Sequence, residues 1–174
     1  MTILSELSTP SAEQLRTASL AVLGQLEEEG YVDPHKVRRC RDVSSMIVAT
    51  LCELEVPGAE VASGSTPGVL AHAIVATGDE VDAVIADATW QQFLPAGFRS
   101  PLGLPRVLVG TRSDVAQLAV SYGVPDGMSD LWPNCTIANT QVWRRADRAA
   151  AEAAQAASDE LWAQYIPPDL ASVQ

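Results

Sequence analysis

The spacing of apolar residues predicts two helices in the first third of the chain. Ser11 and Gln14 have the spacing of a capping box, and the apolar residues after them recur at helical intervals up to Gly30. A second, more regular helix is expected where apolar positions repeat three and four residues apart: Val43, Met46, Ile47, Thr50, Leu51 and Leu54. Each helix therefore presents one apolar face to a core.

Shorter apolar runs bounded by turn residues predict strands in the middle of the chain. Residues 69–77 and 82–87 are two such runs, and the turn Gly78–Asp82 between them indicates a hairpin. Further strands are expected at residues 60–63 and 106–110. The hairpin is the feature that brings side chains from two neighbouring strands together.

The second half of the chain predicts two more helices. The first covers residues 115–122, with a cap at Ser113-Asp114, and residues 124–139 after it are expected to be irregular. The last helix is rich in alanine, begins at Asn139 or Thr140 and ends near Tyr165. It is expected to pack or to form an oligomer contact, although nothing in the sequence indicates an oligomeric state.

Helices followed by strands and then a mixed tail predict an α+β fold. No internal repeat or linker divides the sequence, so we expect a single domain over residues 1–174. In this arrangement the N-terminal helices pack on a small antiparallel sheet, and a helix closes the chain.

The overall charge narrows the classes of partner. The formal net charge is -11 and the pI is about 4.4, which argues against a nucleic-acid binder because phosphates repel such a surface. No apolar run approaches the roughly 18 residues of a membrane span, and no basic, apolar leader begins the chain, so a cytoplasmic protein is expected. The three cysteines lack metal-ligand spacing, so no cofactor or metal is expected.

Two candidate chemical groups lie on the predicted hairpin. His72, one of only two histidines, lies within an apolar run, and Asp87 ends the next run. Side chains on adjacent strands can be cross-strand neighbours. Asp87 can then accept one ring N–H of His72 and fix its tautomer, as the orienting carboxylate does in a nucleophile–base–orienter triad.

Cys40 is the candidate nucleophile for this pair. It lies three residues before Val43, in phase with the buried face, at or near the first turn of the second helix. A helix N-terminus and a neighbouring imidazolium both lower the pKa of a thiol and so favour the nucleophilic thiolate. His35 is the alternative base for this cysteine.

Each of the other side chains near these positions can have either a structural or a functional role. Arg38, Arg39 and Arg41 form either a solvated face or a cationic patch for a carboxylate or phosphate on the substrate or its carrier. Trp90 is expected in the core or in a pocket wall, and Gln92 either supports the strand of Asp87 or binds substrate. We therefore keep Trp90 and Gln92 as candidate substrate-binding residues. Cys52 and Cys135 are expected to be inert.

The order of a cysteine at a helix start, a histidine on a strand and an aspartate closing the next strand resembles the papain-like superfamily. That group includes transglutaminase-like cores, bacterial glutamine deamidases, cysteine-protease effectors and papain-fold toxin domains. Residues 85–93 are similar to the phrase D-x-T-x-x-Q-F around the aspartate of such domains, and residues 71–75 are similar to their H-A-x-V strand. The resemblance covers residues 36–95 and implies a papain-like core.

These observations lead to a cysteine-nucleophile acyl-transfer enzyme with Cys40, His72 and Asp87 as its triad. It would hydrolyse or deamidate an amide or thioester, or form an amide bond, on a small-molecule, carrier-bound acyl or peptide substrate. No Gln or Asn lies between Gln25 and Cys40, so the backbone N–H of Cys40 is the one assigned oxyanion donor.

Two other interpretations remain open at this point. The first is a catalytically silent papain-like domain that binds a partner protein. The second is a plain α+β domain in which Cys40 and His72 never meet.

Overall fold

The computed structural model describes residues 9–30, 39–95 and 103–164. The chain divides into two units, Met1–Thr140 and Gln141–Gln174. The first unit contains a four-stranded sheet and the described candidate site residues, and the second contains most of the last helix. No helix in the described part of the chain has both the length and the apolar character needed to cross a membrane.

The two N-terminal helices form largely as their sequence patterns predict. Helix α1 (Ala12–Glu28) begins with the expected capping box, in which Ser11 and Gln14 exchange hydrogen bonds of 2.8 and 3.2 Å. Helix α2 (Cys40–Glu53) buries Val43, Ser44, Ile47 and Leu51. Leu54 was expected on this buried face, but it is 60% exposed because α2 ends before it.

The sheet is antiparallel throughout and has the strand order β1-β2-β3-β4. Its strands are β1 (Glu60–Thr66), β2 (Val69–Ala76), β3 (Val84–Asp87) and β4 (Leu108–Thr111). The predicted hairpin of β2 and β3 is confirmed, with Val75 opposite Ala86. Strand β1 is longer than expected, because residues 64–66 pair with β2 across an irregular register.

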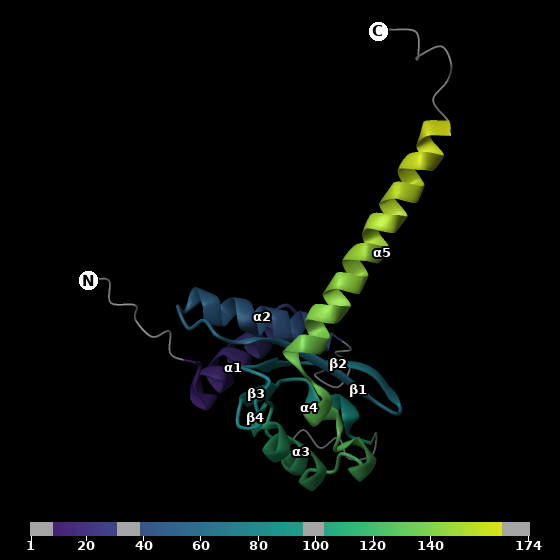
Figure 1. Ribbon diagram of the computed structural model, residues 1–174. Coiled ribbons are helices and arrows are strands. Elements are labelled where there is room, and N and C mark those ends of the chain that lie inside the picture. Colours follow the sequence, from purple (N-terminus) through teal and green to yellow (C-terminus); the bar gives the residue numbers. More distant parts are fainter. Residues whose placement is uncertain (1–8, 31–38, 96–102, 165–174) are drawn as a thin grey trace, which may run out of the picture. The chain divides into compact units, whose positions relative to one another are not determined.

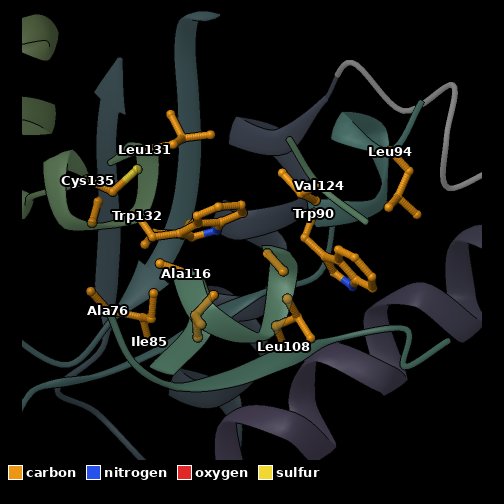
Figure 2. Close-up of a cluster of buried hydrophobic side chains, with 14 residues drawn as sticks. Ala76, Ile85, Trp90, Leu94, Leu108, Ala116, Val124, Leu131, Trp132 and Cys135 are labelled. Carbon is orange, nitrogen blue, oxygen red and sulfur yellow. The ribbon is translucent and has the colours of Figure 1, made fainter. Parts of the chain in front are cut away.

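Helices cover both faces of this sheet (Figure 1), which is why the two central strands, β2 and β3, are apolar along most of their length. Helices α1 and α2 cover one face, with a core that includes Leu15, Ile47 and Val75. Helices α3 (Arg112–Ser121) and α4 (Leu131–Asn134) cover the other. Figure 2 shows part of this second core, which contains Ile85, Trp90, Leu131, Trp132 and Cys135. The α+β class is therefore confirmed.

The second half of the chain departs from the prediction at its helix starts. Thr111, and not Ser113, caps α3 and forms a capping box with Asp114. The stretch 124–139, expected to be irregular, contains a 3-10 turn (Asp126–Met128), α4 and the first residues of α5 (Ile137–Gln164). Helix α5 starts early because the carboxylate of Asp79 accepts from the N–H groups of residues 137 and 138, at 2.7 and 3.1 Å.

Candidate active site

His72 and Asp87 meet inside the protein as the hairpin predicts. Both side chains are fully buried, and His72 Nε2 lies 2.7 Å from Asp87 Oδ2. Only Val75 and Ala76 of β2 pair with β3, so the pairing stops one residue short of Asp87 on β3 and three residues short of His72 on β2. They lie diagonally across the strands, on the face that packs against α3 and α4.

Four contacts hold the carboxylate of Asp87. Its Oδ2 accepts from His72 and, at 2.8 Å, from the indole N–H of Trp132 on α4. Its Oδ1 accepts from the backbone N–H of Thr89 at 2.9 Å and from the Thr89 hydroxyl at 3.3 Å. Burial raises the pKa of Asp87, but His72, Trp132 and Thr89 together hold it below its ordinary value. Asp87 is therefore an anion at neutral pH.

Cys40 is the first residue of α2 and is half-buried. Burial raises the pKa of its thiol, but the nearby His72 and the backbone N–H of Ala73 lower it, and the net shift is downward. Ala73 lies on the part of β2 that β3 does not cover. The structure thus brings Cys40 to His72, and the interpretation in which the two never meet does not describe it.

His72 stands between the two other groups. Burial favours its neutral form, but Asp87 and then Cys40 outweigh burial and raise its pKa to about 9. Because Nε2 faces Asp87, Nδ1 is the atom left for Cys40. Among the described residues Nδ1 has no hydrogen-bond partner, although the Cys40 thiol is near enough for each group to shift the pKa of the other. The Cys40–His72 contact is thus a loose one, as is common in unliganded sites.

Aromatic side chains fix the imidazole ring. Phe93 meets His72 edge-on, with ring centroids 4.8 Å apart and planes at 84°. It meets Trp132 in the same way, at 6.2 Å and 90°. The ring of His72 is therefore packed as well as hydrogen-bonded, which limits its rotation.

The two candidate substrate-binding residues have structural partners. Trp90 is fully buried in the core, and its indole N–H donates to the Pro105 carbonyl at 3.1 Å. This burial gives no support to the expectation that Trp90 contacts a substrate (Figure 2). Gln92 is half-buried and donates to the Thr89 carbonyl at 3.0 Å, so it steadies the turn that holds Asp87.

The remaining candidate groups lie at the edge of the site or outside it. Arg39 and Arg41 are exposed beside Cys40, and Arg39 contacts Asp42 at 2.9 Å. His35 and Arg38 lie outside the described residues. Cys52 is exposed, whereas Cys135 is buried and burial raises the pKa of its thiol. No group of three His, Cys, Asp or Glu side chains suited to a metal occurs in the described ranges.

Trp132 is the residue of the candidate site that sequence reasoning missed, since it lies in a stretch expected to be irregular. The one available signal was that a buried indole N–H needs an acceptor. Its segment is held by the buried Arg112, which donates to the carbonyls of Cys135 and Gly78, both at 2.9 Å. Arg112 also contacts Asp79 at 3.3 Å. This guanidinium ties the β2–β3 turn to the chain that follows α4.

Comparison of the chain with protein-family models, with curated proteins and with solved structures found no match.

Proposed function

We propose that the chain is a cysteine-nucleophile acyl-transfer enzyme with a papain-like core. Cys40 is the nucleophile, His72 the general base and acid, and Asp87 the group that orients His72. The observation that carries the proposal is the continuous series of contacts from buried Asp87 through His72 to Cys40 at the start of α2. The order of helix, strand and strand along the chain supports the papain-like resemblance.

The resting pair in this proposal is a thiolate and an imidazolium. The lowered pKa of Cys40 and the raised pKa of His72 both favour it near neutral pH. The Cys40 sulfur attacks the carbonyl carbon of an amide or thioester and forms a tetrahedral oxyanion. As the C–N or C–S bond breaks, His72 Nδ1 gives its proton to the leaving amine or thiol, and the acyl group stays on Cys40 as a thioester.

The second half of the reaction reverses these proton transfers. Neutral His72 accepts a proton at Nδ1 from a water or an amine, which then attacks the thioester carbonyl. Collapse of the second tetrahedral oxyanion breaks the C–S bond and restores the thiolate and imidazolium. Water yields hydrolysis or deamidation, and an amine yields amide-bond formation.

The first turn of α2 supplies the proposed electrostatic support for the oxyanion. Cys40 is the first helical residue, so its backbone N–H has no acceptor within the helix. That N–H and the positive end of the α2 dipole lie beside the sulfur that attacks. Arg39 and Arg41 flank the same position and add positive charge for an anionic substrate or carrier.

Selective alkylation of Cys40 tests the ion pair directly. The full chain is treated with iodoacetamide at about pH 6, where an ordinary thiol is almost fully protonated, and the adducts are mapped by mass spectrometry. We expect labelling of Cys40 well ahead of exposed Cys52 and buried Cys135, and loss of this preference in His72→Ala. Equal labelling of Cys40 and Cys52 would contradict the proposal.

Acyl transfer itself is tested with p-nitrophenyl acetate and an acetyl thioester. We expect a burst in which each chain releases one equivalent of leaving group. The intact mass should then show one acetyl adduct, which maps to Cys40. Cys40→Ala should show neither the burst nor the adduct. Selective alkylation without any acetyl adduct would favour the catalytically silent binding domain instead.

A further inference from the structure

The backbone N–H of Ala73 has no acceptor in the neighbouring strand β1. Ala73 lies opposite Ser63 of that strand. Ser63 exchanges both of its backbone hydrogen bonds with Thr136, each at 3.0 Å, so its N–H and C=O point away from β2. In an antiparallel ladder the residue opposite such a position also points its N–H and C=O outward. The N–H of Ala73 is therefore directed toward the other edge of β2, on the side of β3.

Strand β3 does not reach this N–H. The nearest residue of β2 that pairs with it is Val75, and in a continued register residue 88 would lie opposite Ala73. The chain instead leaves the sheet after Asp87 and turns at Thr89, whose N–H and hydroxyl donate back to that carboxylate. Within the described part of the chain, Ala73 is thus left without a strand to accept its N–H.

The Cys40 thiol lies beside this N–H. It is close enough for the Ala73 N–H to lower its pKa, and the unpartnered Nδ1 of buried His72 is the ring atom left for the same thiol. Ala73 is 3% exposed and Ile74 is fully buried, so the strand holds the N–H in a fixed direction. Two backbone N–H groups from different elements, that of Cys40 on α2 and that of Ala73 on β2, therefore flank the sulfur.

We propose that the backbone N–H of Ala73 is the second donor of the oxyanion hole, together with the backbone N–H of Cys40. This inference rests on the proposed function, because the oxyanion forms only when Cys40 attacks a carbonyl group. As the C–S bond forms, the π electrons of the carbonyl group move to its oxygen, and the negative charge leaves the sulfur. The two N–H groups beside the sulfur stabilise the charge on that oxygen without moving.

A backbone donor on β2 also fits what the sequence lacks. No Gln or Asn lies between Gln25 and Cys40, so no amide side chain in that stretch can serve as the second donor. The early end of the β2–β3 ladder supplies a backbone N–H in its place. The same turn that holds the carboxylate of Asp87 therefore leaves this donor available to the substrate.

Replacing Ala73 with lactic acid tests this donor in the full chain. The hydroxy acid is introduced at an amber codon and converts the peptide bond between residues 72 and 73 into an ester, which removes the N–H and keeps the methyl side chain. Ala71→lactic acid is the matched control, because it places the same ester in the same strand two residues away. Circular dichroism and urea unfolding compare the folding of the two ester chains.

Two reactions of Cys40 separate the oxyanion from the thiolate. Alkylation by iodoacetamide requires the thiolate but forms no tetrahedral oxyanion, whereas acetylation by an acetyl thioester requires both. The rates are compared at a pH where alkylation of each chain has levelled off, so that Cys40 is ionised. Acetylation of the Ala73 ester chain should be about 100-fold slower than that of the Ala71 ester chain, the usual cost of losing an oxyanion donor. Alkylation should differ little.

Nuclear magnetic resonance of the natural chain provides a second measurement that needs no ester. Acetaldehyde adds to Cys40 and places an oxygen on the carbon bonded to sulfur, whereas iodomethane leaves a thioether without that oxygen. We expect the amide proton of Ala73 to lie further downfield in the acetaldehyde adduct than in the methylated chain, because a hydrogen bond to oxygen deshields the proton. The amide proton of Ala71 should not distinguish the two adducts.

Three results would overturn the inference and leave the triad in place. They are equal acetylation rates in the two ester chains, equal slowing of acetylation and alkylation in the Ala73 ester chain, and the same Ala73 amide shift in both adducts. If the Ala73 ester chain does not fold, the amide shift decides alone. A natural chain that takes up no acetyl group would contradict the proposed function and this inference together.

Discussion

Trp132 donates its indole N–H to Oδ2 of Asp87, the same oxygen that contacts His72. Two groups from different layers of the fold thus meet on one atom, because Trp132 comes from α4 and His72 from β2. A carboxylate held in this way can neither rotate nor leave the imidazole. We therefore expect the position of His72 relative to Cys40 to depend on Trp132, although Trp132 donates its hydrogen bond to Asp87.

Trp132→Phe keeps an aromatic ring at this buried position and removes the donor together with the five-membered ring that carries it. Because a shift of about 1 Å in a catalytic group can cost on the order of 100-fold in rate, we expect Cys40 acetylation to slow by about 10- to 100-fold. Losing a hydrogen bond to a charged group should also cost about 1.5–3 kcal/mol of stability. Burst kinetics and urea unfolding measure the two effects.

Trp90→Phe is the matched control for this change. Trp90 is as deeply buried as Trp132 and loses a hydrogen bond to the Pro105 carbonyl, but it does not contact Asp87. We expect a comparable loss of stability, about 1 kcal/mol or more, with acetylation of Cys40 unchanged. Equal slowing in both variants would mean that Trp132 acts only through general packing.

Asp87→Asn should change the pH at which Cys40 becomes reactive. Asp87 is the chief group that raises the pKa of His72 to about 9. With asparagine there, His72 is neutral near pH 7 and no longer stabilises the thiolate, so the pKa of Cys40 should rise. We expect the rate of alkylation of Cys40 by iodoacetamide to rise with pH and level off at a lower pH in the natural chain than in the variant. Coincident pH profiles would show that the ion pair does not exist.

The same variant should show a stability difference that depends on pH. The pKa of Asp87 is lower in the folded chain than in the unfolded chain, where it is about 3.9. The stability that the ionised carboxylate contributes is therefore present above that pH and is lost as the pH falls below it. The folded pKa of His72 is raised, so its contribution is lost as pH rises through about 9. The free energy of unfolding of the natural chain should therefore exceed that of Asp87→Asn by about 3–5 kcal/mol near neutral pH, which is the cost of breaking a buried ion pair. Urea unfolding of both chains over a series of pH values should show this difference in unfolding free energy becoming smaller at acid pH and again at alkaline pH.

Local sequence signals predicted the parts of the site that local structure determines. The capping box at Ser11, the phase of Cys40 relative to Val43 and the apolar runs of the hairpin are all short-range patterns. The elements that carry Cys40, His72 and Asp87 form where these patterns indicate. The close approach of Cys40 to His72 is different, because it depends on α2 packing on a β2 edge that β3 leaves uncovered. A sequence can suggest that contact but does not determine it.

Long-range contacts account for what sequence reasoning missed. Asp79 caps α5 from 58 positions away, so no residue next to Ile137 indicates the helix start. Trp132 reaches Asp87 across 45 positions. The fully buried position of Trp90 follows from its packing against the α3–α4 layer, and an isolated strand-end motif cannot distinguish that core from a pocket wall.

Two glycines provide a last test of how the site is supported. Gly64 lies opposite His72 in the β1–β2 pairing, and a Cβ there would come within 2.6 Å of the carbonyl carbon of Asn134 and 2.7 Å of the Cys135 nitrogen. These atoms are backbone and belong to the segment just after Trp132. Gly64→Ala must therefore push that segment away, which should cost about 1–3 kcal/mol and slow Cys40 acetylation through Trp132.

Gly24→Ala is the matched substitution, for which we expect stability to increase and not to decrease. Gly24 lies inside α1, and a Cβ there meets nothing within 4 Å. Alanine should stabilise the chain by about 0.5–1 kcal/mol, because glycine in a helix interior carries that cost, and acetylation should not change. Urea unfolding and burst kinetics on both variants separate the effects. If Gly64→Ala retained the natural rate of acetylation, displacement of the segment after Trp132 would not disturb the position of Asp87.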